Sequence, residues 1–397
     1  MTELLLDIDT SDNAVQELVV RMLYWVCPGV RAVRMVDDAR VLVDYEGADT
    51  AADVEAAMRE AIHEITAGGS DFSPTTRYET APKLSTPAFA DPHSELVRRG
   101  WVSAESDGAF TYTGPLAQLF ERLDELFVAR IGVLNPAPAR LPSLLAPQTL
   151  LRSEFLAGSA HTANFVFHLT EGRSVPSRFD AECVDTARST LDLASLPDTA
   201  RHPEAVLSPA ACQPFFRALS GRTLATPQTV TARTVCYRYE SGASNGLRRM
   251  REFSVRELIH VSTPDDVRRT REKMLTVASD LLSEIGLAAQ ITTASDPFFI
   301  DVTARMRMYQ LAFEVKHELL AWIPFDGSRL AVGSVNLHED HFGKAWSIRT
   351  ADGEWAHSCC FGLGLDRWCF AVLAQYGLEP RDWPAVLRPR EQTADAQ

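Results

Sequence analysis

The apolar positions of the first 68 residues repeat with both strand and helix spacing, and predict a short strand, a helix, two strands and a second helix. The second helix is expected over residues 53–65, where one face carries Val54, Met58, Ile62 and Ile65. Gly, Ser, Thr and Pro dominate residues 67–92, as in a linker. We therefore predict a small N-terminal α/β module, residues 1–82, and a larger domain, residues 83–397, with the boundary near Lys83.

In the larger domain, the pattern predicts a helix over residues 115–131 with a broad apolar stripe that must be covered, by the core or by a second copy of the chain. A second helix is expected over 264–285, because Thr263 precedes Pro264 and Gly286 follows. Strands are expected around 231–240 and 328–336. Strands separated by single helices favour an α+β domain with a mainly antiparallel sheet.

Composition adds limits on partners and location. The chain has 397 residues, a net charge of -14 and no apolar run long enough to span a membrane. The acidic start differs from a secretory signal, so a cytoplasmic location is expected. An acidic surface argues against a large nucleic-acid interface, although a local basic cluster needs its own explanation. That cluster comprises Arg233, Arg238, Arg248, Arg249, Arg251 and Arg256.

The segment 234–257 carries the clearest chemistry. A strand ends in Arg-x-Glu, a loop rich in Gly, Ser and Asn follows, and a second strand opens with Arg-Glu-Phe. An arginine that binds phosphate, a carboxylate that accepts from an amine and an aromatic ring that stacks on a purine would together bind ATP. A surface hairpin with cross-strand ion pairs is the alternative.

This segment, with RYESGASNGLRRMREF, resembles motif 2 of class II aminoacyl-tRNA synthetases, and FGLGLDR at 361–367 resembles motif 3. The resemblance implies a class II catalytic domain in which Arg238 contacts the α-phosphate, Glu240 the adenine edge, Phe253 the adenine face and Arg367 the γ-phosphate of ATP. Asp366 stands where the family more often has Glu. Motif 1 would be the helix 115–131 followed by a strand at Leu141-Pro142, which would place it in a homodimer interface.

Three further phrases resemble the truncated seryl-synthetase homologues that load amino acids onto carrier proteins. They are LAFEVKHELL, GSVNLHEDHFGKAW and AHSCCFGLGLDRWCFAVLAQYG. This resemblance implies one zinc ion per subunit, held by Cys212, Glu257 and Cys360, with Mg²⁺ and ATP at the same site. Three ligands leave a fourth zinc position open for a substrate amine. Cys359 is the adjacent alternative to Cys360, and because successive strand residues face opposite ways, only one should bind.

Other polar groups have less defined roles. Lys316 and Asn336 are candidates for the aminoacyl pocket, and Lys316 with Glu318 could instead form a cross-strand ion pair. Residues 336–341 form a polar run that could be a second metal site, a solvated turn or polar residues around the aminoacyl site. The family resemblance implies that Glu339 or Asp340 could assist Mg²⁺.

The predicted function is ATP-dependent formation of an aminoacyl-adenylate, followed by transfer to the phosphopantetheine thiol of a carrier protein. Partners would be the amino acid, the carrier and a second copy of the chain, whereas tRNA and membranes are not expected. The alternatives are a zinc-dependent seryl-tRNA synthetase and a catalytically silent regulator. A basic patch of Arg268, Arg269 and Arg271 is a candidate for carrier docking.

Overall fold

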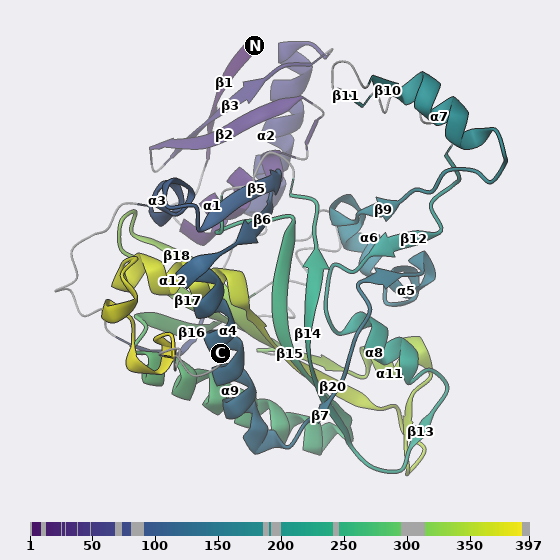
Figure 1. The fold of residues 1–397 in the computed structure, drawn as a ribbon, viewed down its shortest axis with the longest axis vertical. Coiled ribbons are helices and arrows are strands. Elements are labelled where there is room, and N and C mark those ends of the chain that lie inside the picture. The colour runs from purple at the N-terminus through teal and green to yellow at the C-terminus, as the bar shows by residue number, and fades with distance from the viewer. Residues whose placement is uncertain are drawn as a thin grey trace, which may run out of the picture.

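The fold is described from a computed structural model (Figure 1). The described residues are 2–8, 13–24, 26–27, 29–37, 39–47, 49–67, 74–80, 91–185, 190–191, 200–240, 246–294 and 314–390.

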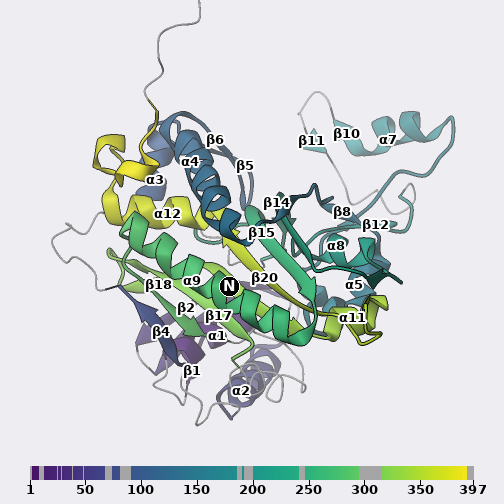
Figure 2. The same ribbon diagram turned by 90° about the horizontal axis from the view of Figure 1, so that it is seen from below.

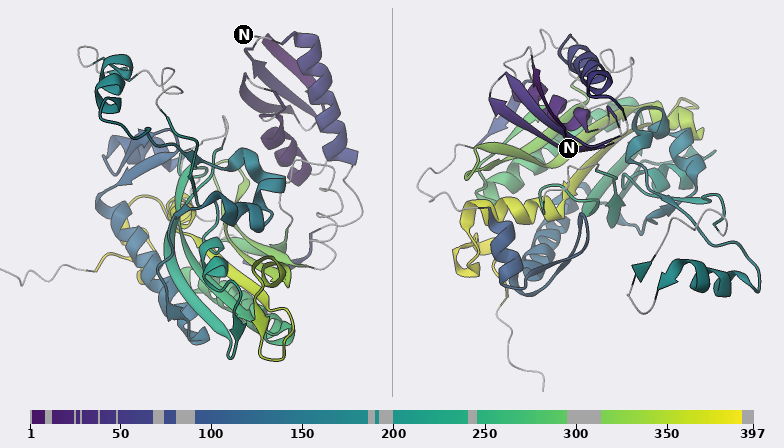
Figure 3. Two further views of the ribbon diagram at one scale, coloured as in Figure 1. Left: turned by 90° about the vertical axis from the view of Figure 1, so that its right-hand side faces the viewer. Right: turned by 90° about the horizontal axis from the view of Figure 1, so that it is seen from above.

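The N-terminal module forms a sheet of its own with two helices on one side. Its elements follow the predicted order: β1 (Thr2–Asp7), α1 (Asn13–Leu23), β2 (Val30–Asp37), β3 (Arg40–Tyr45) and α2 (Ala51–Ala67). The antiparallel sheet has the order β1-β3-β2, and the fully buried Leu6, Val43 and Met58 lie in the core between sheet and helices. Figures 1 and 3 show this module at one end of the molecule, beside the large sheet.

A short strand before the predicted boundary joins the larger domain. β4 (Thr76–Glu79) pairs with β16 (Ala289–Thr293) at the edge of the large sheet. The boundary near Lys83 lies outside the described residues, so the division at 82 stays a prediction. Because β4 is hydrogen-bonded to the large sheet, we propose that the separate N-terminal unit ends with α2.

The larger domain is built on an eight-stranded sheet with the order β4-β16-β17-β18-β20-β15-β14-β7. Every neighbouring pair is antiparallel except β7 with β14. The predicted α+β fold with a mainly antiparallel sheet is therefore confirmed. The remaining strands of this sheet are β7 (Ala137–Pro138), β14 (Gln228–Tyr237), β15 (Glu252–Ser262), β17 (Lys316–Ile323), β18 (Ser328–Glu339) and β20 (His357–Gly364).

Three long helices cover one face of this sheet, as Figure 2 shows. They are α4 (Gly114–Ile131), α9 (Pro264–Ile285) and α12 (Leu365–Tyr376). The apolar stripe of α4 is buried against α12, α9 and β15, with Leu119, Leu123 and Phe127 fully enclosed. The stripe therefore belongs to the core of this chain, and a partner chain is not needed to cover it.

The ends of α9 agree with its sequence signals. Pro264 opens the helix after Thr263, and Gly286 adopts a left-handed conformation with φ of 71° that ends it. Of the proposed docking arginines, Arg268 and Arg269 are exposed and pair with aspartates of the first turn. Arg271 is only 8% exposed and contacts His317. The prediction that Arg271 belongs to a docking patch was therefore wrong. Helical spacing turns Arg271 toward the sheet.

Shorter elements cover the opposite face of the sheet. α8 (Gln213–Ala218) and α11 (His341–Trp346) pack there around Phe216 and Phe342. Beside them lies a small sheet of order β8-β12-β9, formed by β8 (Leu144–Leu145), β9 (Phe165–Val166) and β12 (Ala205–Leu207). Figure 3 shows α7 (Val175–Cys183) and β10 (Val184–Asp185) projecting away from the body of the molecule. The remaining short elements are α3 (Pro92–Arg98), β5 (Val102–Ser106), β6 (Ala109–Tyr112), α5 (Pro147–Arg152), α6 (Phe155–Ser159), β11 (Thr190–Leu191), β13 (Thr223–Leu224) and β19 (Arg349–Thr350).

The strand expected at Leu141-Pro142 lies earlier in the chain. After α4 the chain enters the sheet as β7, where Pro138 stands opposite Thr231 of β14. The N–H of Ala139 then donates to the Thr231 carbonyl at 2.8 Å. A proline is tolerated here because β7 is an edge strand, and its missing N–H costs no ladder hydrogen bond. Leu141 and Pro142 lie outside any strand, so the prediction of a strand there was wrong, and the first strand after α4 holds Pro138 instead.

Within the described part of the chain, no helix is both long enough and apolar enough to cross a membrane.

Candidate metal and nucleotide site

Cys212, Glu257 and Cys360 meet on the face of the sheet opposite the long helices. Their ligand atoms, two thiol sulfurs and a carboxylate oxygen, all lie within 4.8 Å of one another, and all three residues are buried. Cys212 precedes α8, whereas Glu257 and Cys360 lie on the adjacent strands β15 and β20. Three segments far apart in sequence thus bring together the residues predicted to hold zinc.

The two strands place their ligands diagonally. Glu257 stands opposite Gly362, and Cys360 stands opposite Ile259, two positions along. A Cβ on Gly362 would lie 2.8 Å from Oε2 of Glu257. Glycine at 362 therefore leaves the space that the carboxylate occupies. Gly362 was not among the predicted site residues, although its position two residues after Cys360 on a strand places it on the same face of the sheet.

The acidic groups of the cluster bind a cation in their deprotonated forms, which burial alone disfavours. Burial raises the pKa of the Glu257 carboxyl to about 7, against the opposing effects of Cys360 and the Arg238 guanidinium. The pKa of the Cys360 thiol is raised well above its usual range by its hydrogen bond with Cys212 and by burial. Buried acids without a partner are costly, and a divalent cation removes that cost. Two sulfurs and one carboxylate oxygen fit zinc, with a fourth position for a substrate group.

Cys359 faces away from this cluster. Its sulfur lies 3.7 Å from the Val267 carbonyl oxygen and 3.9 Å from the Met274 sulfur, both on α9. The alternation of side chains along β20 thus separates the two cysteines, and only Cys360 reaches Cys212 and Glu257.

Replacing Gly362 by alanine is expected to lower zinc affinity at least about tenfold, because the new methyl group takes the space of the Glu257 carboxylate. Chelator competition measures the effect. Gly132→Ala is the matched control, since a Cβ there meets nothing within 4 Å. Equal zinc affinity in both variants would contradict this role for Gly362.

Arg238 and Phe253 lie together where β14 ends and β15 begins, at the connected end of this hairpin. The Arg238 guanidinium is 5.4 Å from the centre of the Phe253 ring, and its Nε donates to the Pro209 carbonyl at 2.9 Å. Arg238 also lowers the pKa of Glu257, so the predicted phosphate and metal residues share one electrostatic environment. Residues 241–245, between them in the sequence, lie outside the described residues.

Glu240 follows β14, and Arg367 lies in α12, directly after β20. Glu240 accepts a hydrogen bond from Arg249 at 2.8 Å, so its proposed contact with adenine would compete with this pair. Arg367, in the first turn of α12, donates to the Ala331 carbonyl at 3.1 Å. The roles of all four proposed ATP residues remain predictions.

Most of the basic cluster is neutralised by acidic partners. Arg256 makes a two-armed contact with Asp124 of α4 at 2.7 and 2.6 Å. The other pairs are Arg233 with Glu121, Arg248 with Asp326, Arg249 with Glu240 and Arg251 with Asp107. The cluster therefore serves largely to join the hairpin to its neighbours, which explains basic residues in an acidic protein.

Asp366 fixes the start of α12 to the hairpin. Its carboxylate accepts from the Ser254 N–H at 2.6 Å and from the Tyr112 hydroxyl at 2.7 Å. Burial raises its pKa to about 6. The shorter aspartate thus has a specific structural role where the family more often has glutamate.

The raised pKa of Asp366 predicts a pH dependence of stability. A carboxyl that binds its proton more tightly in the folded state stabilises the fold most below its unfolded pKa, and this stabilisation is lost as pH rises through about 6. Asp366→Asn removes that loss. Relative to the parent, its unfolding free energy should rise by about 1 kcal/mol between pH 5 and 7.5, as measured in urea. A constant difference across that range would contradict the assignment.

Lys316 and Asn336 lie in one cross-strand row with Cys360. Lys316 of β17 stands opposite Asn336 of β18, which stands opposite Cys360 of β20. The Asn336 amide nitrogen is 3.6 Å from the Cys360 sulfur. Lys316 pairs with Glu318 at 3.0 Å along the same strand, so the ion pair exists but does not cross strands. Both candidates for the aminoacyl pocket therefore border the metal cluster, and their role remains a prediction.

The polar run 336–341 divides into separate contacts. His338 approaches Cys360, whereas Asp340 pairs with Lys344 at 2.8 Å, and His341 contacts the Ser153 carbonyl oxygen at 3.2 Å. Among the described residues, only Cys212, Glu257 and Cys360 form a group suited to a metal. This argues against a second metal site, and the predicted solvated turn is limited to Asp340, between β18 and α11. The proposed Mg²⁺ role of Glu339 or Asp340 is untested.

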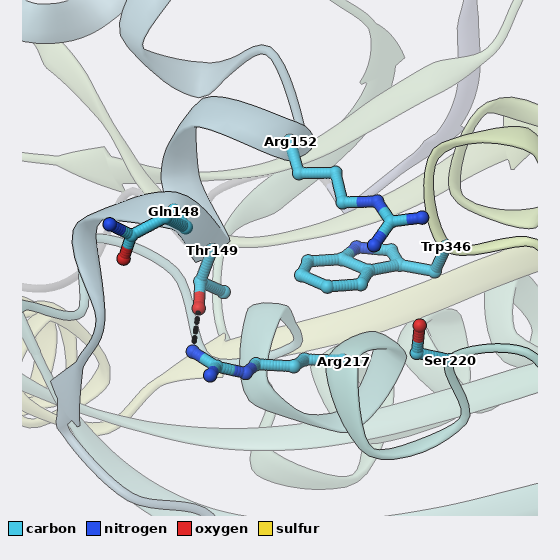
Figure 4. A pocket seen from close by; sticks show the side chains of 6 residues that line it. All are labelled: Gln148, Thr149, Arg152, Arg217, Ser220 and Trp346. Carbon is cyan, nitrogen blue, oxygen red and sulfur yellow. Dashed lines mark hydrogen bonds between the residues drawn. The ribbon is translucent and has the colours of Figure 1, made fainter.

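A separate hollow of about 310 Å³ lies between α5, α8 and α11. Figure 4 shows the Arg152 guanidinium over the Trp346 ring and the hydrogen bond of 2.7 Å from Arg217 to Thr149. Gln148 and Ser220 complete the lining. None of the predicted ATP, metal or amino-acid residues lines this hollow, so it is distinct from the candidate site.

Comparison with known proteins connects this geometry to a family. Residues 198–376 match the family model described as the tRNA synthetase class II core domain (G, H, P, S and T). An amino acid–[acyl-carrier-protein] ligase 1 of Bradyrhizobium diazoefficiens is 31% identical over 311 residues, which cover 77% of this chain and 91% of that protein. The chain belongs to the class II aminoacyl-tRNA synthetase family.

Two archaeal comparisons extend the class II likeness. The type-2 serine–tRNA ligase of Methanopyrus kandleri is 30% identical over 324 residues, covering 76% of this chain but only 60% of that protein. The crystal structure of M. kandleri SerRS in complex with A. aeolicus tRNASec superposes with a TM-score of 0.72 at 25% identity. It covers 97% of this chain and 76% of that one, so the structural likeness includes the N-terminal module.

Proposed function

We propose that this class II protein is a ligase that activates an amino acid with ATP and transfers it to the phosphopantetheine thiol of a carrier protein. The observation that carries the proposal is the convergence of Cys212, Glu257 and Cys360 beside the Arg238–Phe253 hairpin. The likeness to an amino acid–[acyl-carrier-protein] ligase over 91% of that protein supports the choice of acceptor.

In the first step, a carboxylate oxygen of the amino acid attacks the α-phosphorus of ATP. The bond from the α-phosphorus to the bridging oxygen breaks, and pyrophosphate leaves. Arg238 would stabilise the charge that develops on the α-phosphate, and Arg367 would bind the γ-phosphate. Phe253 would hold the adenine ring by stacking, with Glu240 at its edge once released from Arg249.

Cys212, Glu257 and Cys360 would hold zinc, which when bound supplies a Lewis-acid position for the α-amine. Holding the amine fixes the carboxylate relative to ATP and rejects acids that lack an amine. Mg²⁺ would accompany ATP. Lys316 and Asn336 border this position and would contact the substrate side chain.

In the second step, the carrier thiol loses its proton and attacks the carbonyl carbon of the adenylate. AMP leaves, and a thioester forms. Neither step requires a nucleophile from the protein. The product is an aminoacylated carrier.

We further propose that the protein acts as a homodimer in the cytoplasm.

Transfer to tRNA is the second candidate function. The observation that favours it is the superposition with M. kandleri SerRS over 97% of this chain, a structure determined with tRNASec bound. The expectation that tRNA is not a partner is weakened by this likeness. The sequence likeness covers only 60% of the M. kandleri protein.

An acceptor experiment separates the two functions. Purified protein with ATP, Mg²⁺, zinc and a pool of amino acids is offered phosphopantetheinylated carriers and total tRNA in parallel. A mass gain on the carrier alone supports the ligase. Charging of tRNA alone would replace the proposal with the synthetase function, and no adenylate with any amino acid would favour a silent regulator.

A further inference from the structure

His338 occupies an irregular position on the strand next to Cys360. Leu337 stands opposite Cys359 and Glu339 opposite Ser358, so His338 is an extra residue in β18, a β-bulge. Glu339 has a positive φ of 48°, which accompanies the irregularity. Without the bulge, His338 would stand opposite Ser358. Bulges are common beside functional sites, and His338, like Asn336 two residues earlier, lies against the Cys360 sulfur.

Both ring nitrogens of His338 have polar neighbours. Nε2 lies 3.5 Å from the Cys360 sulfur, and Nδ1 lies 3.1 Å from the Ser358 hydroxyl oxygen. Ser358 is 1% exposed. A deprotonated cysteine sulfur only accepts hydrogen bonds, so Nε2 carries the proton when Cys360 is a ligand, and Nδ1 accepts from the Ser358 hydroxyl.

Two aromatic rings fix the plane of the imidazole. Phe216 and Phe342 stack on each other at 3.9 Å, and both meet the His338 ring edge-on, at 5.8 and 4.9 Å. Phe216 lies on α8, the helix that follows Cys212, so one packed unit links His338 to both cysteines. A histidine with polar contacts at both ring nitrogens and two aromatic neighbours has little freedom to rotate.

We propose that His338 is a positioning residue for the metal centre, through a hydrogen bond from its Nε2–H to the Cys360 thiolate. The inference rests on the zinc site in the proposed function. Donors to a thiolate ligand withdraw charge from the sulfur and hold it in place, so the metal keeps more positive charge for a substrate amine. Neither His338 nor Ser358 has a role in the activation chemistry proposed above.

Zinc affinity and the spectrum of the cobalt-substituted protein test this inference without any activity assay. His338→Ala should weaken zinc binding about 10–100-fold in chelator competition. It should also move the sulfur-to-cobalt charge-transfer band to longer wavelength, because the sulfur loses a donor. His338→Gln, which keeps an N–H at the end of its side chain, should restore most of the affinity and the band position.

His341→Ala is the matched control, because its ring contacts the Ser153 carbonyl oxygen instead of a proposed ligand. It should bind zinc as the parent does, and Ser358→Ala should fall between the parent and His338→Ala. Parent-like affinity and spectrum in His338→Ala would overturn the inference. So would equal losses in His338→Ala and His338→Gln, since packing alone would then explain them.

The test also separates this inference from the proposed reaction. A parent protein that binds zinc but aminoacylates neither carrier nor tRNA would remove the proposed function and leave the role of His338 intact. A parent protein that binds neither zinc nor cobalt would overturn the metal site and the role of His338 together.

Discussion

Replacing Cys360 by serine is expected to abolish stoichiometric zinc and to lower amino-acid-dependent ATP–pyrophosphate exchange by more than about 100-fold. Loss of an outer-shell hydrogen bond commonly costs roughly 10–100-fold in metal affinity or activity, and loss of a ligand should cost more. The reason is structural, because Cys360 supplies one of only three ligand atoms that converge at this position in the described chain. Metal content and exchange are measured on the same preparation.

Cys359→Ser is the matched control. It makes the same chemical change one residue away, on the side of β20 that faces α9. Zinc content and exchange should stay near those of the parent, with some loss of stability, because a hydroxyl would replace a fully buried thiol. If both variants lost zinc equally, or if Cys360→Ser kept it, the proposed ligand set would be incorrect.

Replacing Arg238 by alanine is expected to reduce amino-acid-dependent exchange by about 10²–10³-fold, the usual effect of removing one preorganised charge partner from a transition state. Arg238 is held by the Pro209 carbonyl and the Phe253 ring. Zinc content should remain about one ion per chain, because the substitution leaves the metal ligands unchanged.

Arg233→Ala supplies the comparison for Arg238. Arg233 lies on the same strand, β14, but its guanidinium pairs with Glu121 of α4 at 2.8 Å. Its loss should affect stability slightly and exchange little, as is usual for a partly exposed ion pair. Exchange at nearly the parent rate in Arg238→Ala would contradict its contact with the α-phosphate.

Much of the fold was predictable from sequence because local signals agreed with the tertiary structure. The order of elements in the N-terminal module, the capped helix α9 and the hairpin β14–β15 all follow from spacing, caps and turn residues. The resemblance to the truncated seryl-synthetase homologues also anticipated which three residues meet in the metal cluster. Strand alternation correctly separated Cys360 from Cys359.

The features that sequence did not predict depend on long-range pairing. Thr76–Glu79 pairs with a strand more than 200 residues away, and β7 is too short to produce a periodic pattern. Gly362 matters only because a carboxylate from another strand lies over it. The bulge at His338 follows from the register between β18 and β20, which no local signal specifies.

We propose above all that Cys212, Glu257 and Cys360 hold a zinc ion that selects an α-amino acid for activation by ATP. Amino-acid-dependent pyrophosphate exchange, measured before and after zinc removal with each amino acid and its des-amino analogue, tests it most directly. We expect exchange with at least one amino acid and none with its des-amino analogue. Chelation of zinc should abolish this exchange, and added zinc should restore it. Exchange that survives zinc removal or proceeds with the des-amino acid would contradict it.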